Sequence, residues 1–247
     1  MRTGFRAFAL VLGLATTVPA AWENNQCVKC HEAEALPITL GHTFADWSAS
    51  THAHGGVGCE KCHGGDASST DEAKAHANVR PSTDPESLVH PTRLPETCGA
   101  CHHEELAAFK GTVHARELRQ KATGATCFTC HEAMATSLPT PRELSARCAV
   151  CHAKPVEAQA AIAVLVMAKR RVYRARVAME AAKTADPSWH ASALGRFHQL
   201  ERDYHAIQVQ WHVFAMKETI QASRDIIKLA EALTDEADVM TRRARKQ

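Results

Sequence analysis

The sequence has few aromatic residues, six methionines and no cysteine outside one recurring motif. Aromatic types make up 5% of the 247 residues, although hydrophobic types together reach 45%, so side chains alone would build only a modest core. Basic residues outnumber acidic ones by only 29 to 27. This balance leaves no basic excess for nucleic acid, and we expect no nucleic-acid partner.

The N-terminal apolar run covers only residues 7–18, which is too short to span a bilayer. Arg2 and Arg6 precede it, and Val18-Pro19-Ala20 offers small residues for cleavage. Residues 1–20 are therefore expected to be a secretory signal peptide, with an uncleaved membrane tether as the alternative. An exported location, such as the periplasm, without a stable membrane anchor follows from the first interpretation.

All ten cysteines fall in five copies of the pattern Cys-x-x-Cys-His. The first to fifth motifs are Cys27–Cys30–His31, Cys59–Cys62–His63, Cys98–Cys101–His102, Cys127–Cys130–His131 and Cys148–Cys151–His152. The pattern is typical of c-type haem attachment, in which two thiols add to the vinyl groups of one haem and the histidine becomes the proximal iron ligand. A disulfide framework or zinc sites also use paired cysteines, but neither requires a histidine after every second one. We expect five covalently bound haem c groups.

With these motifs the chain resembles the multihaem c-type cytochromes. Within them it looks most like small carriers related to the ammonia-forming nitrite reductase and hydroxylamine oxidoreductase superfamily. The resemblance covers residues 27–152 through the motifs and extends more weakly to the rest of the chain. It implies that a second histidine commonly completes the axial coordination of each haem iron.

The resemblance also bears on catalysis. The nitrite reductases carry lysine in place of the motif histidine at the catalytic haem, whereas all five motifs here end in histidine. The hydroxylamine oxidoreductases use a tyrosine crosslinked to haem, and the only tyrosines here, Tyr173 and Tyr204, lie beyond the motifs. We therefore expect no catalytic residues and lean away from an enzyme.

Residues 27–63 and 98–131 look like two copies of one unit. Between its two motifs each copy carries an aromatic residue, two residues, Ser or Thr, one residue, then His-Ala. The histidines are His52 and His114. They are expected to be distal ligands of the haem that precedes each, with an ordinary surface histidine as the alternative.

Other histidines compete for the remaining distal positions. His76, His90 and His42 lie near motifs and are candidates, although each could also be a loop histidine. No histidine lies between His131 and Cys148, so the fourth and fifth haems lack a local donor. His198, His205 and His212 recur every seven residues along one side of an expected helix, so one or two of them could reach these haems. The alternative is that they are polar residues flanking a packed helix.

Composition changes after His152, where glycine and cysteine nearly vanish. The expected fold is mainly α with extensive irregular loops: a signal (1–20), a covalent multihaem domain (21–153) and a long antiparallel helical hairpin (154–247). Short helices are expected near Trp47 and over residues 104–115, and loops between Gly55 and Pro95. In the hairpin, helix 155–183 precedes a second helix from Pro187 to at least Leu233. Its apolar seam is Phe197, Leu200, Tyr204, Ile207, Trp211 and Phe214.

The expected function is an electron carrier between redox proteins, such as a quinol-oxidising membrane cytochrome and a terminal reductase. The methionine-poor motif region, with only Met134, predicts mostly low-potential haems, and Met134 itself is a weak ligand candidate. Two alternatives stay open. One is a reductase of a small nitrogen or sulfur oxyanion at an open-site haem. The other is a structural haem subunit that assembles a homo-oligomer or a larger complex through its helical tail.

Overall fold

The computed structural model describes residues 24–32, 42–132, 134, 140–153 and 155–246. The expected signal peptide, residues 1–20, lies outside the described residues. Across the described ranges the regular structure is helical and contains no strand, which confirms the mainly α fold. No helix among those residues is both long and apolar enough to cross a membrane.

Each motif lies in or beside a short helix. These helices are α1 (Gln26–His31), α4 (Glu60–His63), α6 (Leu94–Gly99), α9 (Cys127–His131) and α10 (Pro141–Ala149). In the motifs the backbone N–H of the histidine donates to the carbonyl of the first cysteine, as between His63 and Cys59 at 2.9 Å. One helical turn therefore brings both thiols and the imidazole of a motif together.

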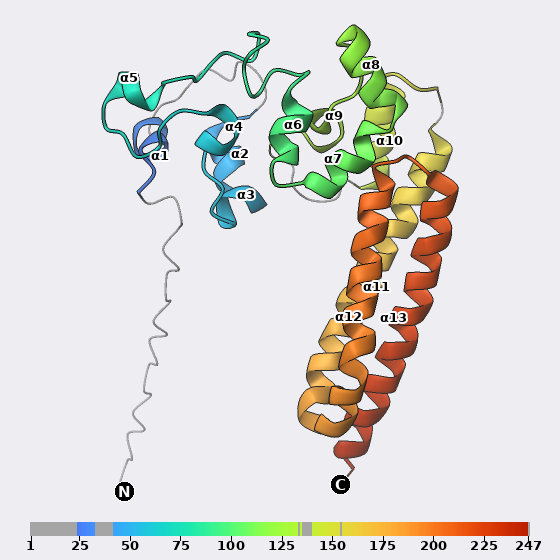
Figure 1. Cartoon of the computed structure of the whole chain (residues 1–247). Helices are drawn as coiled ribbons and strands as arrows, with labels where there is room; N and C mark the ends of the chain where they lie inside the picture. The colour runs from blue at the N-terminus through green and yellow to red at the C-terminus, as the bar shows by residue number, and fades with distance from the viewer. Residues whose placement is uncertain (1–23, 33–41, 133, 135–139, 154, 247) are drawn as a thin grey trace, which may run out of the picture.

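Five further short helices connect the motifs: α2 (Phe44–Ser48), α3 (Thr51–His54), α5 (Glu72–Ala75), α7 (His103–Lys110) and α8 (Val113–Lys121). The helices expected near Trp47 and over 104–115 are present, although the latter is split at Gly111–Thr112. Between Gly55 and Pro95 most residues are irregular, as predicted. In Figure 1 the elements extend from α1 and α5, side by side at one end, through α2, α3 and α4 to α6–α10 beside the long helices.

The tail is a bundle of three long helices, α11 (Val156–Ala185), α12 (Pro187–Trp211) and α13 (Met216–Ala244). The predicted start at Pro187 is confirmed, because Asp186 caps α12 and accepts a hydrogen bond from the Trp189 N–H at 3.0 Å. The predicted two-helix hairpin is wrong. The expected long second helix stops at Trp211, turns over residues 212–215 and returns as α13 beside α11 (Figure 1).

Small residues let these helices pack closely. Ala161, Ala168, Ala175 and Ala182 recur every seven residues on α11, and all four are fully buried. An alanine at each contact allows two helix backbones to approach, and the seven-residue period keeps the contact on one face. Helix α13 meets this face with residues such as Ala230 and Ala237, also fully buried.

The predicted seam of α12 is buried in the bundle core from Phe197 to Trp211. Phe214 is an exception, because it lies in the turn after α12 and outside that core. Leu144 and Cys148 of α10 also pack into the bundle core. The fifth motif is therefore attached directly to the bundle, and the turn 212–215 faces the motif-bearing region (Figure 1).

Candidate functional site

The structure places each motif histidine beside one histidine from elsewhere in the chain. The ring pairs and their centroid separations are His31–His76 at 5.9 Å, His63–His42 at 5.9 Å, His102–His52 at 6.2 Å, His131–His212 at 6.1 Å and His152–His114 at 5.9 Å. A metal-bound imidazole nitrogen lies about 2 Å from its metal, so two rings on opposite sides of one ion have centroids about 6 Å apart. The five pairs fit one iron each.

The thiols fit the same group. All ten cysteines are free, and each motif keeps its pair within one helical turn. Burial raises the pKa of the Cys59 thiol to about 11, so this thiol stays protonated at neutral pH. Two thiols and two imidazoles at each motif are the donors that a covalent haem with two axial histidines requires.

Burial also keeps several of the paired imidazoles neutral. Burial, and after it the neighbouring His212, lower the pKa of His131 to about 4. The pKa values of His63, His52 and His114 are likewise lowered, first by burial and then by the paired histidine. A neutral imidazole retains the lone pair with which it binds iron.

Three of the second histidines are oriented through the other ring nitrogen. The Nδ1 of His42 lies 3.1 Å from the Thr43 carbonyl, that of His76 lies 2.9 Å from the Glu72 carbonyl, and that of His212 lies 2.9 Å from the Gln208 carbonyl. When Nδ1–H donates to a carbonyl, the tautomer is set and Nε2 remains available to a metal. These contacts are the usual support of a metal-binding histidine.

The first copy of the repeat builds a fixed frame for His52. Trp47 is buried, and its indole N–H donates to the Val57 carbonyl at 3.2 Å. The Ser50 hydroxyl caps α3 by accepting from the Ala53 N–H at 3.2 Å, and Ala53 is buried as well. His52 thus lies on a single helical turn, which the Ser50 cap and the buried side chains of Trp47 and Ala53 hold in place.

The second copy repeats this frame for His114. Phe109 is buried, Thr112 caps α8 by accepting from the Ala115 N–H at 3.1 Å, and Ala115 is buried. The repeat seen in the sequence is therefore a repeat of structure. However, the pairing differs from the expected one, because His52 lies beside His102 and His114 beside His152, and not beside the motif that precedes each. In each copy the histidine pairs with the first motif that follows the copy in the sequence: His52 with the third motif and His114 with the fifth.

Replacement of Ser50 with alanine is expected to destabilise this frame by about 1 kcal/mol, because the Ala53 N–H loses its cap in a buried position. The low-spin signal of the third haem should broaden, and the urea midpoint of the holoprotein should fall. Ser48→Ala is the matched control, since the Ser48 hydroxyl only returns to the Ala45 carbonyl at an exposed position. Equal behaviour of the two variants would contradict the framing role of Ser50.

His76 reaches His31 because the chain turns back after the second motif. Gly64 and Gly65 have φ values of +80° and +87°, a backbone conformation that favours glycine. The loop after this turn lies against α1, where the Gln26 N–H donates to the Ala67 carbonyl at 2.7 Å. The loop and α5 therefore bring a histidine from beyond the second motif to the first.

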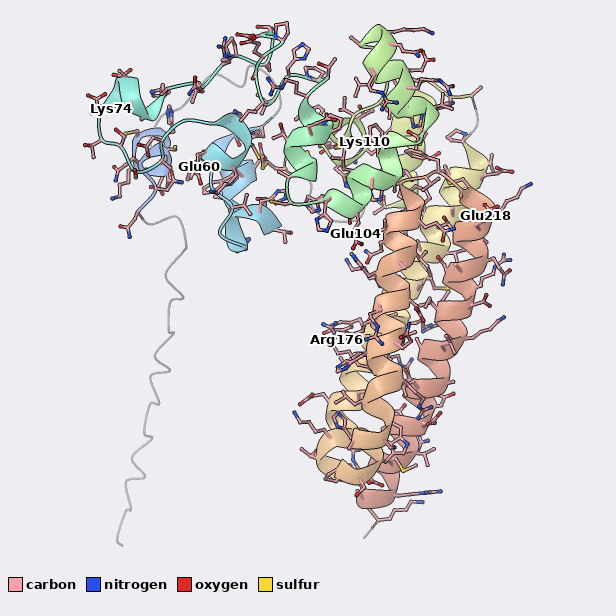
Figure 2. The ribbon with its side chains drawn as sticks, viewed as in Figure 1. Glu60, Lys74, Glu104, Lys110, Arg176 and Glu218 are labelled. Carbon is pink, nitrogen blue, oxygen red and sulfur yellow. The ribbon has the colours of Figure 1, made fainter. Side chains whose placement is uncertain are left out.

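The fourth motif obtains its partner from the tail. Ten residues before His52 the first copy has His42, which pairs with His63, but ten residues before His114 the second copy has Glu104. Glu104 instead lies 3.3 Å from His205 Nε2 on α12. Figure 2 shows Glu104 where α7 approaches the bundle. Seven residues after His205, about two helical turns further along the chain, His212 supplies the ring that faces His131.

The remaining candidates lie elsewhere. The Nδ1 of His90 is 2.8 Å from the Thr92 hydroxyl, the His198 ring lies beside Phe197, and His205 pairs with Glu104. Met134 packs against the small cluster of Val28, Trp47 and Ala53. His90, His198 and His205 are thus not brought to a motif histidine, whereas His42, His52, His76 and His114 are. His212 shares its seven-residue spacing with His198 and His205, and spacing alone did not distinguish the three.

Successive motifs are neighbours in space. Cys59 packs on the cluster that contains Val28 of the first motif, and α6 contacts α9, so that Cys98 of the third motif lies close enough to Cys127 of the fourth for the two thiols to shift each other's pKa. Arg147 of α10 donates to the Cys130 carbonyl and, at 2.6 Å, to Glu132, which joins the fifth motif to the fourth.

Comparison with known proteins finds similarity to polyheme c-type cytochromes. The chain is 30% identical over 115 residues to a C-type polyheme cytochrome, OmcC, of Geobacter sulfurreducens, and 31% identical over 118 residues to the polyheme cytochrome OmcB of the same species. Each match covers 44% of this chain and 14% of the relative, so the chain matches only about one seventh of the length of these relatives. No solved structure matches the chain.

A family match covers more of the sequence. Residues 14–64 and 97–181, together more than half of the chain, match the family described as cytochrome c554 and c-prime. The matched ranges contain all five motifs, three of the five histidines that pair with them (His42, His52 and His114) and most of α11, the first helix of the bundle. The free thiols and the histidine pairs are the groups that covalent haem c requires, and the chain belongs to the cytochrome c554 and c-prime family of multihaem c-type cytochromes.

Proposed function

We propose that this protein carries electrons along five haems, each held by one motif and one of the five histidine pairs. The observation that supports the proposal most strongly is the complete pairing: every motif histidine has a second histidine at about the separation that one shared iron requires. The proposed proximal ligands are His31, His63, His102, His131 and His152. The proposed distal ligands, in the same order, are His76, His42, His52, His212 and His114.

Two axial histidines leave an iron without a position for substrate, which suits a carrier better than an enzyme. The tyrosines offer no alternative chemistry at the pairs, because Tyr204 is buried in the bundle core and Tyr173 is largely exposed on α11. Haem supplies the electron-accepting iron, and the chain sets its ligands, exposure and hydrogen bonds.

The contacts between successive motifs support a path that follows the order of the chain. The first and second motifs share one small cluster, and the third, fourth and fifth are joined by the Cys98–Cys127 contact and by Arg147. Electrons would then enter or leave near α1 at one end and near α10, beside the bundle, at the other (Figure 1). The proposed partners are redox proteins, such as a quinol-oxidising cytochrome and a terminal reductase, in an exported compartment such as the periplasm.

The purified holoprotein tests this proposal directly. Five haems are expected from the pyridine haemochrome assay and the intact mass, and all five should be low-spin. Their reduction potentials should lie below those of His/Met cytochromes, because two histidines stabilise the oxidised iron. A high-spin haem in the wild type, or rapid turnover of nitrite, hydroxylamine or sulfite, would favour the reductase alternative instead.

A further inference from the structure

The turn between α12 and α13, residues 212–215, contacts two of the histidine pairs. His212 faces His131 of the fourth motif. Two residues later, the ring of Phe214 lies 4.6 Å from the ring of His114 at an interplanar angle of 90°. The ring of His114 also faces the ring of His152 of the fifth motif, with a centroid separation of 5.9 Å. One tight turn of the tail therefore touches the ligand sets of two haems.

Phe214 adopts a backbone conformation that its side chain does not favour. Its φ is +61°, in the left-handed region where bulky residues are rare. The turn is held by backbone hydrogen bonds from Phe214 N to the Trp211 carbonyl at 2.9 Å and from Met216 N to the Phe214 carbonyl at 3.1 Å. Glycine would suit this position better for the backbone alone. A strained residue of this kind persists where its side chain has a role that glycine cannot fill.

His114 differs from three other distal histidines in how it is held. His42, His76 and His212 each direct Nδ1 to a backbone carbonyl. The Nδ1 of His114 is buried and has no hydrogen-bond partner. Its ring orientation therefore depends on packing, and the perpendicular ring of Phe214 is the aromatic group placed against it.

We infer that Phe214 is a positioning residue for the fifth haem: its ring holds His114 in the orientation that faces His152, in place of the carbonyl contact that His42, His76 and His212 have. The inference rests on the proposed ligation of the fifth haem by His114 and His152. It makes the turn 212–215 a double support, in which His212 completes the fourth haem and Phe214 orients the distal ligand of the fifth.

The test separates the ring of Phe214 from the shape of the turn. Phe214→Gly removes the ring and keeps the left-handed backbone conformation, which glycine adopts without strain. Phe214→Tyr keeps the aromatic ring. Val213→Ala changes an exposed neighbour in the same turn and is the matched control. A His114→Ala variant assigns the fifth haem, since its EPR signal is the one lost there.

For Phe214→Gly, the expected result is a shifted or broadened low-spin EPR signal of the fifth haem and partial carbon monoxide binding by the reduced protein, up to one equivalent per chain. The fourth-haem signal should stay unchanged. Phe214→Tyr and Val213→Ala should match the wild type. An unchanged fifth-haem signal in Phe214→Gly, an equal change in Val213→Ala, or a change confined to the fourth haem would overturn the inference.

Failure of the proposed function would look different. In that case the wild type itself would hold fewer than five haems, or His114→Ala would remove no low-spin signal. A wild type with five low-spin haems and a Phe214→Gly variant without any change would refute the role of Phe214 and leave the carrier function standing.

Discussion

Replacement of His212 with alanine is expected to empty the distal position of the fourth haem. The variant should keep five attached haems, because attachment uses only the motifs, while one haem in five becomes high-spin in the oxidised protein. The reduced protein should bind about one equivalent of carbon monoxide. The reason is geometric: His212 is the ring placed 6.1 Å from His131, and Glu104 occupies the place that a local histidine has in the first copy of the repeat.

His205→Ala and His198→Ala are the matched controls for this variant. Both histidines lie on the same helix at the same seven-residue spacing, but His205 faces Glu104 and His198 lies beside Phe197. Loss of the exposed His205–Glu104 pair should cost well under about 1 kcal/mol. A fully low-spin His212→Ala protein, or a high-spin signal in His205→Ala instead, would refute the assignment of His212.

The second large effect is expected when haem is withheld. Protein made without haem attachment, and kept reduced, should retain the helices of the bundle but lose the fold described for residues 24–32 and 42–132. In that range the buried apolar side chains are few, and the cluster of Val28, Trp47 and Ala53 is small. The bundle core is much larger and consists entirely of protein side chains. Covalent groups must stabilise a segment that cannot bury enough surface by itself.

Limited proteolysis followed by mass spectrometry measures this difference. In the apoprotein a fragment that covers α11, α12 and α13 should persist, while cleavage should be rapid across the motif region. In the holoprotein both parts should resist. Circular dichroism should show the apoprotein retaining mainly the bundle's helix signal. Protection of the motif region in the apoprotein would show that its side chains, without haem, are enough to fold it.

Much of the site is readable from the sequence because haem attachment is a local requirement. The two cysteines and the histidine of a motif lie within one helical turn, so their spacing along the chain is their spacing in space. The same holds for the frames of His52 and His114, where the aromatic residue, the capping hydroxyl and the buried alanine lie within seven residues. The motif inventory, the repeat and the mainly α fold were therefore predictable.

The pairing of the histidines was not predictable, because every pair joins distant parts of the chain. His76 reaches back across the second motif to His31, and His52 reaches forward to His102. Such contacts depend on how loops return, for example through the positive-φ glycines 64 and 65. Spacing could not separate His212 from His198 and His205, since only the end of α12 lies against the motif region.

The break between α12 and α13 shows the same limit. Residues 211–216 contain neither glycine nor proline, so the local sequence predicts a continuous helix. The structure ends α12 at Trp211 with Phe214 in a left-handed conformation, which tertiary contacts must stabilise. The sequence alone determined which residues can attach haem and which can form helices, because these are local properties of spacing and composition. Only the tertiary structure decided which histidines meet and where the tail folds back, because those outcomes depend on packing between segments far apart in the chain.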